Sequence, residues 1–208
     1  MNTLIIAEAG VNHNGSINYA KKLIDIATDS GADYVKFQTF VTSENITRDA
    51  SKANYQLSYN DNKDSQFEML KKLELDKKTH LDLINYCNKN GIQFLSTAFG
   101  ISSLDLLNKL EIPLIKIASG ELTNLPYLRI VGNMGKRVIL STGMANLKEV
   151  DSAINILENS GTHRSLITAL HCNTEYPTPM SDVNLNAMLT IRDKLGVKVG
   201  YSDHTLGI

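Results

Sequence analysis

The sequence lacks the features that mark several large classes of protein. Its 208 residues include only two cysteines and four prolines. Cys87 and Cys172 form no CxxC motif and no cysteine–histidine cluster, which excludes a disulfide scaffold and a structural zinc site. No apolar run approaches the ~18 residues of a membrane span, and no charged lead precedes the first apolar run at 4–7. We therefore expect a cytoplasmic, reducing setting and no membrane partner.

The sequence also lacks an excess of charge of either sign. Lysine and arginine total 21 and aspartate and glutamate total 22, for a net charge of −1. No long-range attraction to a polyanion follows, so nucleic acid is not an expected partner. Hydrophobic residues make up 42% of the chain, which suits an ordinary globular core.

What the sequence does contain is a regular alternation. Short apolar runs bounded by Gly, Ser or Asn occur at 3–8, 33–39, 93–97, 114–119, 137–141, 166–171 and 197–201. Segments with helical period lie between them, as at 17–27, 104–110, 150–157 and 186–195. Gly31, Gly91, Gly161 and Gly196 follow helical segments, as expected of left-handed C-caps.

This alternation predicts an α/β protein with a parallel sheet and right-handed crossovers. No GxGxxG or GxxxxGK[ST] motif follows a strand, so a (β/α)₈ TIM-type barrel is favoured over a doubly wound sheet. Such a barrel needs eight strands, and we count seven. We expect residues 1–208 to form a single barrel domain that is incomplete at its C-terminus, truncated after about seven strands, rather than an odd open barrel.

Polar side chains follow each predicted strand. Carboxyl ends of barrel strands face a common mouth, and polar groups within Val, Ile and Leu runs are costly to bury without partners. Lys36 and Gln38 share one face of their strand by the period of two. We expect an active site at this mouth.

The side chains at this mouth restrict the substrate. Two ammonium groups stand among several hydroxyls: Lys36, Lys116, Thr97, Ser119, Ser141 and Ser202. They suit a small dianion that carries phosphate and carboxylate, although either lysine alone is also typical of a strand-end salt bridge. Glu8 and Glu121 are the candidate acid and base groups, and a structural role for Glu8 stays open.

Histidine supplies the metal-ligand candidates. His204, beside Asp203, comes first, with His171 and His13 behind it, and at least one further ligand is needed. His171 is equally well explained as a hydrogen-bonded core histidine.

Other features have simpler interpretations. We expect His80 to lie on a helix surface and His163 to lie in a solvated turn. We expect both cysteines to be small buried apolar groups. The polar stretch 41–65 is either an insertion or a lid over the mouth.

Five motifs together resemble a known family. They are AEAGVNHNG at 7–15, VKFQT at 35–39, LSTGM at 140–144, HCNTEYPTP at 171–179 and SDHT at 202–205. In order and spacing they resemble the bacterial sialic acid (N-acetylneuraminate) synthases, with legionaminate and pseudaminate synthases as close relatives. The similarity runs from about Leu4 to Leu206.

The resemblance implies a transferase of the EC 2.5.1 type. It would condense phosphoenolpyruvate, water and N-acetylmannosamine, or a related N-acyl aminosugar, to N-acetylneuraminate and phosphate. The C–C bond forms in an aldol-like step and phosphoenolpyruvate is cleaved at its C–O bond. A divalent metal, Mn²⁺ or Mg²⁺, and a homodimer of the full-length protein are also implied; the acyl-sugar itself stays open.

The resemblance also implies roles for single residues. The phosphoenolpyruvate ligands would be Lys36, Thr97, Lys116, Ser119, Ser141 and Ser202. Gln38, Glu121 and Tyr176 would face the sugar, with Asp203 among the substrate-binding residues. Glu8 would stand next to the reacting carbon as a catalytic residue with Lys36 and Lys116, and His204 would bind the metal. The family often has His-Cys-Thr-Asn where this chain has HCNT, so an amide contact is divided between Asn173 and Thr174.

The chain departs from the family in length. Members continue through an eighth strand with a second metal-binding histidine and then an antifreeze-like (SAF) domain, and this sequence contains neither. Three alternatives stay open: a Schiff-base aldolase using Lys116 or Lys36, a phosphoenolpyruvate-dependent aldose-phosphate condensing enzyme, and a truncated barrel that binds ligand without turnover.

Overall fold

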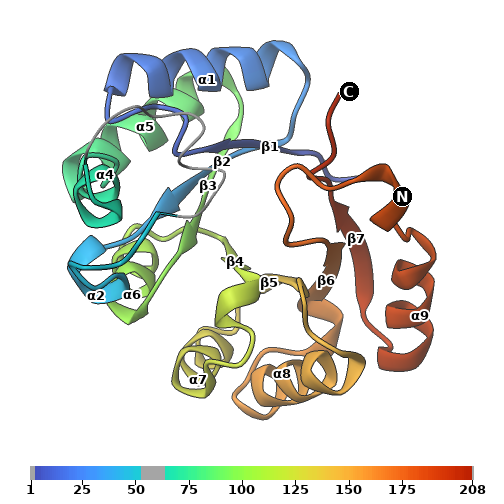
Figure 1. The fold of residues 1–208 in the computed structure, drawn as a ribbon. Helices are drawn as coiled ribbons and strands as arrows, with labels where there is room; N and C mark the ends of the chain where they lie inside the picture. The colour runs from blue at the N-terminus through green and yellow to red at the C-terminus, as the bar shows by residue number, and fades with distance from the viewer. Residues whose placement is uncertain (1–2, 53–63, 208) are drawn as a thin grey trace. The chain divides into compact units, whose positions relative to one another are not determined.

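The computed structural model describes residues 3–52 and 64–207. Within these ranges the strands are β1 Ile6–Gly10, β2 Tyr34–Thr39, β3 Gln93–Ala98, β4 Leu114–Ile117, β5 Arg137–Ser141, β6 Ile167–Cys172 and β7 Lys198–Ser202. The helices are α1 Ile17–Asp29, α2 Thr42–Asn45, α4 Gln66–Lys71, α5 Lys77–Asn90, α6 Ile101–Lys109, α7 Leu125–Asn133, α8 Leu147–Asn159 and α9 Asn186–Leu195. Strands alternate with helices along the chain, which confirms the predicted α/β class (Figure 1).

The chain divides into two compact units, Met1–Ile112 and Pro113–Ile208. The first unit contains β1, β2 and β3, which pair in parallel and in chain order. The second contains β4 to β7, paired in the same way. Parallel neighbours need a crossover between them, and the helices supply it.

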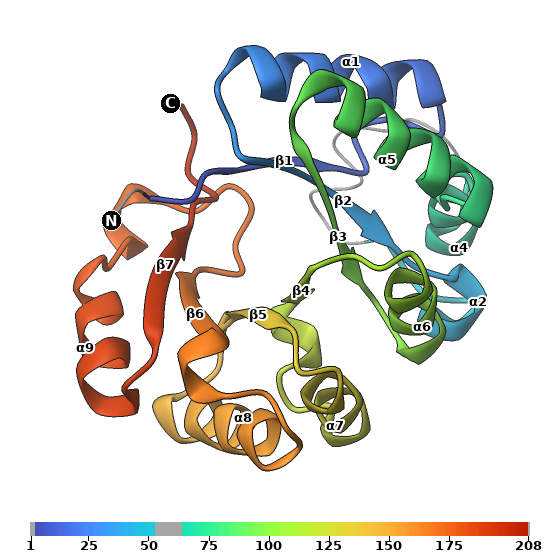
Figure 2. The same cartoon turned by 180° about the vertical axis from the view of Figure 1, so that it is seen from behind.

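In the first unit, α1 and α5 lie side by side (Figures 1 and 2). Ser16 caps α1 by accepting the backbone N–H of Tyr19, and the helix buries Ala20, Ile24 and Ala27. An isoleucine side chain fully removed from water stabilises the fold by roughly 2 kcal/mol. This apolar stripe holds α1 in place.

In the second unit, α7 and α8 lie side by side, and one glycine permits their close approach. A Cβ atom at Gly132 would stand 2.4 Å from the Cβ of Ser160 and 2.8 Å from the carbonyl oxygen of Leu157. The backbone of α7 therefore touches the end of α8. Asn146 and Glu149 form a capping box that begins α8.

Strand and helix positions agree closely with prediction except at the start. The first strand was predicted from residue 3 and begins at Ile6. Leu4 and Ile5 are apolar but 39% and 51% exposed, and the Ile5 N–H donates to the Asp33 side chain. The left-handed C-caps at Gly91 and Gly196 are confirmed. Gly31 and Gly161 also have positive φ, as predicted, and each directly follows the cap residue of its helix, Ser30 of α1 and Ser160 of α8.

The predicted surface position of His80 is wrong. This side chain is 0% exposed, and its ring is hydrogen-bonded to the hydroxyl of Thr39. Burial of Cys87 and Cys172 and exposure of His163 are confirmed. In the segment predicted as an insertion or lid, residues 53–63 lie outside the described residues.

Among the described residues, no helix has the length and apolar character needed to cross a bilayer.

Candidate active site

The first unit gathers four of the predicted residues at the carboxyl ends of its strands: Glu8, Lys36, Gln38 and Thr97, here called the Lys36 cluster. Gln38 stands opposite Thr97 in the β2–β3 register, so the two share a face. The Lys36 ammonium pairs with the Glu8 carboxylate. The Lys36 side chain is 13% exposed and that of Glu8 is 52% exposed, so the cluster opens to solvent on the Glu8 side.

Gly10 brings the polar groups of this cluster together. Its φ is +53°, and a Cβ there would lie 3.0 Å from Glu8 Oε1 and 3.8 Å from Gln38 Nε2. The carboxylate and the amide thus lie over the same bare stretch of backbone, at the end of β1. Left-handed backbone and close approach both favour glycine here.

Thr97 carries an unsatisfied hydroxyl. It is 3% exposed, and its Oγ1 has no hydrogen-bond partner within the described part of the chain. A buried polar atom left unpaired costs about 1–3 kcal/mol. Such an atom among charged groups at a strand end is typical of a ligand contact that the free protein leaves open.

The second unit gathers a further group at the ends of β4, β5 and β6: Lys116, Ser119, Ser141, Gly143 and Thr174, here called the Lys116 cluster. Lys116 is 7% exposed. Its ammonium donates to Ser141 Oγ at 2.6 Å and to the Ile117 carbonyl at 3.1 Å. Desolvation strengthens the attraction between a buried ammonium and an anion, so Lys116 favours the binding of a negatively charged ligand here.

Gly143 packs tightly within this cluster. Its φ is +51°, and a Cβ would stand 2.5 Å from the Ser119 Cβ and 3.0 Å from the Thr174 methyl group. Its N–H donates to Cys172 Sγ at 3.2 Å. Gly143 was not among the candidate residues predicted from the sequence, although its place after Ser141 and Thr142 at a strand end was the available signal.

The residues Asn173 and Thr174 play different parts. The Asn173 amide donates to the backbone carbonyl of Asp182 at 3.1 Å, whereas the Thr174 methyl lies against Gly143 and hence beside Ser119. Of the two, Thr174 is the one that the structure places in the Lys116 cluster.

His204 has the hydrogen-bond arrangement of a metal ligand. Its Nδ1 lies 2.8 Å from the Asn173 carbonyl oxygen, which can only accept, so Nδ1 carries the proton. In the neutral ring, Nε2 then keeps its lone pair, with Ser202 Oγ 3.3 Å away. Ligating histidines commonly donate their other N–H to a carbonyl in this way. The Tyr176 ring lies 4.6 Å from the His204 ring, centroid to centroid.

One histidine does not complete a metal site. Within residues 3–52 and 64–207, no group of three or more His, Cys, Asp or Glu side chains could hold an ion. His204 therefore fits a divalent metal as one ligand of a set.

Of the other two histidine candidates, His13 is buried and His171 is half-buried. Burial lowers the pKa of His13 and that of His171. His13 Nδ1 accepts the Gly15 N–H at 3.0 Å, and the His171 ring stacks on Tyr201 at 5.7 Å. Nε2 has no partner in either ring, among the atoms described.

Two acidic candidates are engaged locally. Asp203 accepts the Thr205 N–H at 2.9 Å, which holds the pKa of its carboxyl below the ordinary value. Glu121 accepts the Asn124 side-chain amide at 2.7 Å, and Asn124 also caps α7. Both carboxylates shape turns that follow strands.

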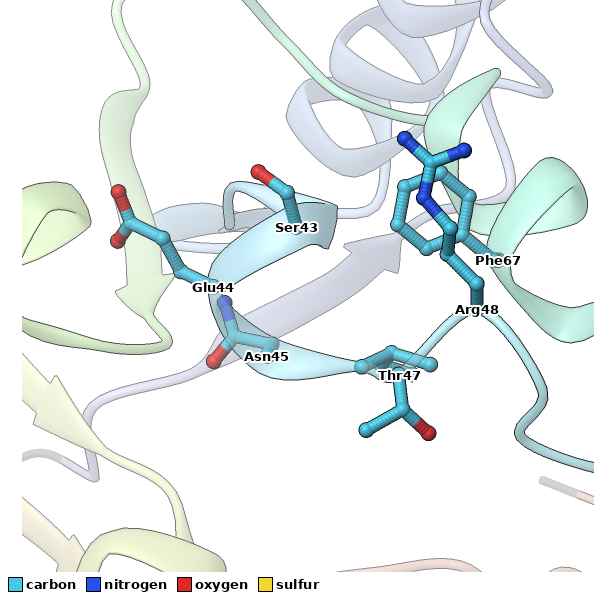
Figure 3. Close-up of a pocket in the computed structure, with 7 residues that line it drawn as sticks. Ser43, Glu44, Asn45, Thr47, Arg48 and Phe67 are labelled. Atoms are coloured by element: carbon cyan, nitrogen blue, oxygen red, sulfur yellow. The ribbon is translucent and has the colours of Figure 1, made fainter.

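A separate hollow of about 360 Å³ lies in the first unit and holds none of the predicted residues. In Figure 3 the Arg48 guanidinium stands beside the Phe67 ring, 5.4 Å from its centroid. The remaining lining residues are Ser43, Glu44, Asn45, Ile46 and Thr47, on and after α2.

The chain is similar to a known family and to several proteins that are named synthases. The family model described as the NeuB family matches residues 23–208. An N,N'-diacetyllegionaminic acid synthase of Campylobacter jejuni is 56% identical over 99% of this chain and 62% of its own length. A Legionella pneumophila enzyme of the same name is 45% identical over 100% of this chain and 59% of its own length. The chain thus spans about three fifths of these curated relatives.

The fold comparison agrees. The crystal structure of an N-acetylneuraminic acid (sialic acid) synthetase from Leptospira borgpetersenii, in complex with citrate, superposes with a TM-score of 0.84 at 33% identity. The match covers 99% of this chain and 67% of that one. It confirms the predicted barrel-type fold, of which residues 3–52 and 64–207 contribute seven strands.

Proposed function

Because the chain belongs to the NeuB family, we propose that it carries the catalytic barrel of a phosphoenolpyruvate-dependent sugar-acid synthase. The observation that carries the proposal is the position of Lys116. This residue is 7% exposed, and its ammonium donates a hydrogen bond to Ser141 on the neighbouring strand. A buried cation with hydroxyl neighbours suits a small phosphorylated carboxylate. The Lys36 cluster supplies a second cation, a carboxylate and an unsatisfied hydroxyl.

The proposed product is a legionaminate-type acid. N-acetylmannosamine was the sugar expected from the sequence resemblance, with legionaminate and pseudaminate synthesis as alternatives. Two of the similar relatives, at 56% and 45% identity, are named N,N'-diacetyllegionaminic acid synthases, which favours legionaminate. Phosphoenolpyruvate supplies three of the nine carbons, so the co-substrate is a six-carbon aldehyde sugar, and the name of the product gives it two N-acetyl groups.

The phosphoenolpyruvate ligands that we propose are those that the family resemblance implies. The assigned ligands are Lys36, Thr97, Lys116, Ser119, Ser141, Thr174 and Ser202. Lysine ammonium groups neutralise phosphate and carboxylate as point charges, while hydroxyls orient the oxygens. Gln38, Glu121, Tyr176 and Asp203 are assigned to the sugar, as the resemblance implies.

The reaction proceeds in three balanced steps. The methylene carbon of phosphoenolpyruvate attacks the sugar aldehyde, whose oxygen gains a proton, and positive charge develops at the carbon that bears the phosphate. Water adds to that carbon and loses a proton. The C–O bond to phosphate then breaks with its electron pair leaving on phosphate, while the new hydroxyl loses its proton and becomes the ketone.

The residues of the Lys36 cluster suit the central step. Glu8 stabilises the developing cation and accepts the proton of the water. Lys36 is the ion-pair partner of Glu8 in the free protein. The resemblance implies that Lys36 and Lys116 would neutralise the leaving phosphate. Thr97 donates its open hydroxyl to the same substrate.

A divalent ion, Mn²⁺ or Mg²⁺, would be held by His204 Nε2 together with ligands from elsewhere, and when bound it supplies Lewis-acid polarisation of the aldehyde. The His204 Nδ1–H bond to the Asn173 carbonyl fixes the ring for this role. We further propose that the enzyme is cytoplasmic and that the full-length protein is a homodimer.

The test is release of phosphate by the full chain from phosphoenolpyruvate with each aminosugar in turn. We expect release with the di-N-acetylated sugar, weaker release with N-acetylmannosamine, and loss of both on addition of EDTA. His204→Gln should lower the apparent affinity for Mn²⁺, while His163→Gln, an exposed control, should not. Trapping of a covalent adduct by borohydride would instead indicate a Schiff-base aldolase and contradict the proposal.

A further inference from the structure

A buried polar cluster lies outside the candidate site in the first unit: Thr39 at the end of β2, Ser96 in β3 and His80 in the first turn of α5. Their exposed fractions are 2%, 1% and 0%. Thr39 Oγ1 lies 2.7 Å from His80 Nε2 and 2.7 Å from Ser96 Oγ, and His80 Nδ1 lies 2.8 Å from the Asp76 carbonyl oxygen. Such groups are costly to bury unless every one is hydrogen-bonded, and here they are.

The direction of each hydrogen bond in this cluster follows from chemistry. A carbonyl oxygen can only accept, so His80 Nδ1 carries a proton and donates to Asp76. The neutral ring has one proton, so Nε2 accepts, and the Thr39 hydroxyl donates to it. The Thr39 oxygen then accepts from Ser96. Burial lowers the pKa of His80, partly opposed by Asp76, which agrees with a neutral ring.

The cluster stands directly behind two residues of the candidate site. Side chains alternate along a strand, so Thr39 and Ser96 point away from the face that carries their neighbours Gln38 and Thr97. Gln38 and Thr97 pair in register on that other face. The hydrogen bonds from Ser96 through Thr39 to His80 tie the ends of both strands to the start of α5.

We propose that His80, acting through Thr39 and Ser96, is a positioning residue that holds Gln38 and Thr97 in the geometry that substrate binding requires. Thr97 keeps a buried hydroxyl unpaired in the free protein, and a support behind the sheet keeps that hydroxyl from turning toward another partner. The catalytic meaning of this role rests on the proposed function.

The first test determines which nitrogen of the His80 ring carries the proton. Long-range ¹H–¹⁵N NMR of the full chain labelled at histidine should show His80 neutral with its proton on Nδ1. A ring protonated on Nε2 would overturn the proposal, because Thr39 could then not donate to it.

The second test separates positioning from packing. Thr39→Val keeps the volume and removes the hydroxyl, and should lower kcat/KM for phosphoenolpyruvate about 10-fold and shift the NMR signals of the Gln38 amide and the Thr97 methyl. Thr39→Ser restores the hydroxyl and should restore both readouts. Thr190→Val, on the exposed side of α9, should change neither.

The other possible results for these variants also support or overturn the positioning role of His80. Unchanged activity and signals in Thr39→Val, or equal losses in Thr39→Val and Thr39→Ser, would overturn the proposal. If Thr39→Val fails to fold, Ser96→Ala replaces it. This variant removes only the hydrogen bond between Ser96 and Thr39, and the same activity and NMR measurements decide the outcome. A wild-type chain without synthase activity would refute the proposed function, and the Gln38 and Thr97 signals would still decide the positioning role.

Discussion

The ammonium of Lys116 lies 2.6 Å from the hydroxyl of Ser141, across the neighbouring strands β4 and β5. Lys116 is opposite Ile139 in the register, and Ser141 is two residues further on the same face. The bond therefore runs diagonally along the sheet. It points the buried cation toward the carboxyl ends of the strands, where loops carry function in barrel folds.

Replacing the Lys116 cation should strongly weaken the binding and use of phosphoenolpyruvate. Lys116→Met keeps the side-chain length and removes the charge, so kcat/KM for phosphoenolpyruvate should fall at least about 100-fold. Lys109→Met removes an exposed lysine that pairs with Asp105 and should leave activity near wild type. Steady-state kinetics and calorimetric titration with phosphoenolpyruvate provide the measurements. Equal binding by Lys116→Met and wild type would contradict the assignment.

Glu8 should matter for turnover more than for binding. Glu8→Gln keeps the shape but cannot take up the water proton, so we expect kcat to fall about 100-fold with a much smaller change in KM for phosphoenolpyruvate. The control is Glu158→Gln, which changes an exposed carboxylate 3.6 Å from Arg164. Near-normal turnover in Glu8→Gln would show that Glu8 is a structural partner of Lys36 only.

The contact at Gly143 should make this glycine indispensable for reasons of space. Gly143→Ala and Gly135→Ala both place a side chain on left-handed backbone, at φ +51° and +60°, which costs roughly 1–2 kcal/mol. Only at Gly143 does the new Cβ also meet Ser119 and Thr174, so about 1–3 kcal/mol more should be lost. Chemical denaturation of both variants measures the difference. Equal free energies of unfolding would mean that the loop moves aside freely.

Three histidines whose rings are wholly or partly desolvated should make the fold sensitive to acid. Burial lowers the pKa of His13, His80 and His171 below 6.5, so the unfolded chain takes up their protons first. Above pH 6.5 these histidines therefore leave the free energy of unfolding unchanged. Below pH 6.5 the free energy of unfolding falls by up to about 1.4 kcal/mol per pH unit for each histidine. Denaturation curves from pH 7.5 to 5 test this, and His80→Gln should flatten the slope. A stability that rises toward pH 5 would contradict the prediction.

The sequence predicted the strands well because they are apolar on both faces and end in polar residues, as buried parallel strands do. The start of β1 was misjudged because Leu4 and Ile5 are as apolar as the strand itself. Only the backbone bonds to Asp33 and Tyr34 show that pairing begins differently there. A local pattern cannot contain that information.

The sequence predicted some features of the candidate site and missed others, as it did for the strands. Period-two spacing placed Lys36 and Gln38 on one face, and the structure gives Gln38 its partner Thr97. His80 was misjudged because its neighbours in α5 are polar, whereas its partner Thr39 lies 41 residues away. The tight packing at Gly143 likewise depends on Ser119 and Thr174, which no local pattern connects to it.

The most direct measurement follows the bridging oxygen of phosphoenolpyruvate. The full chain is supplied with phosphoenolpyruvate labelled with ¹⁸O between C2 and phosphorus, together with the di-N-acetylated sugar, and the products are examined by mass spectrometry. The account predicts that the label leaves in inorganic phosphate, because the C–O bond breaks and water supplies the ketone oxygen. Unlabelled phosphate, which requires cleavage at the P–O bond, or phosphate released without the sugar, would contradict it.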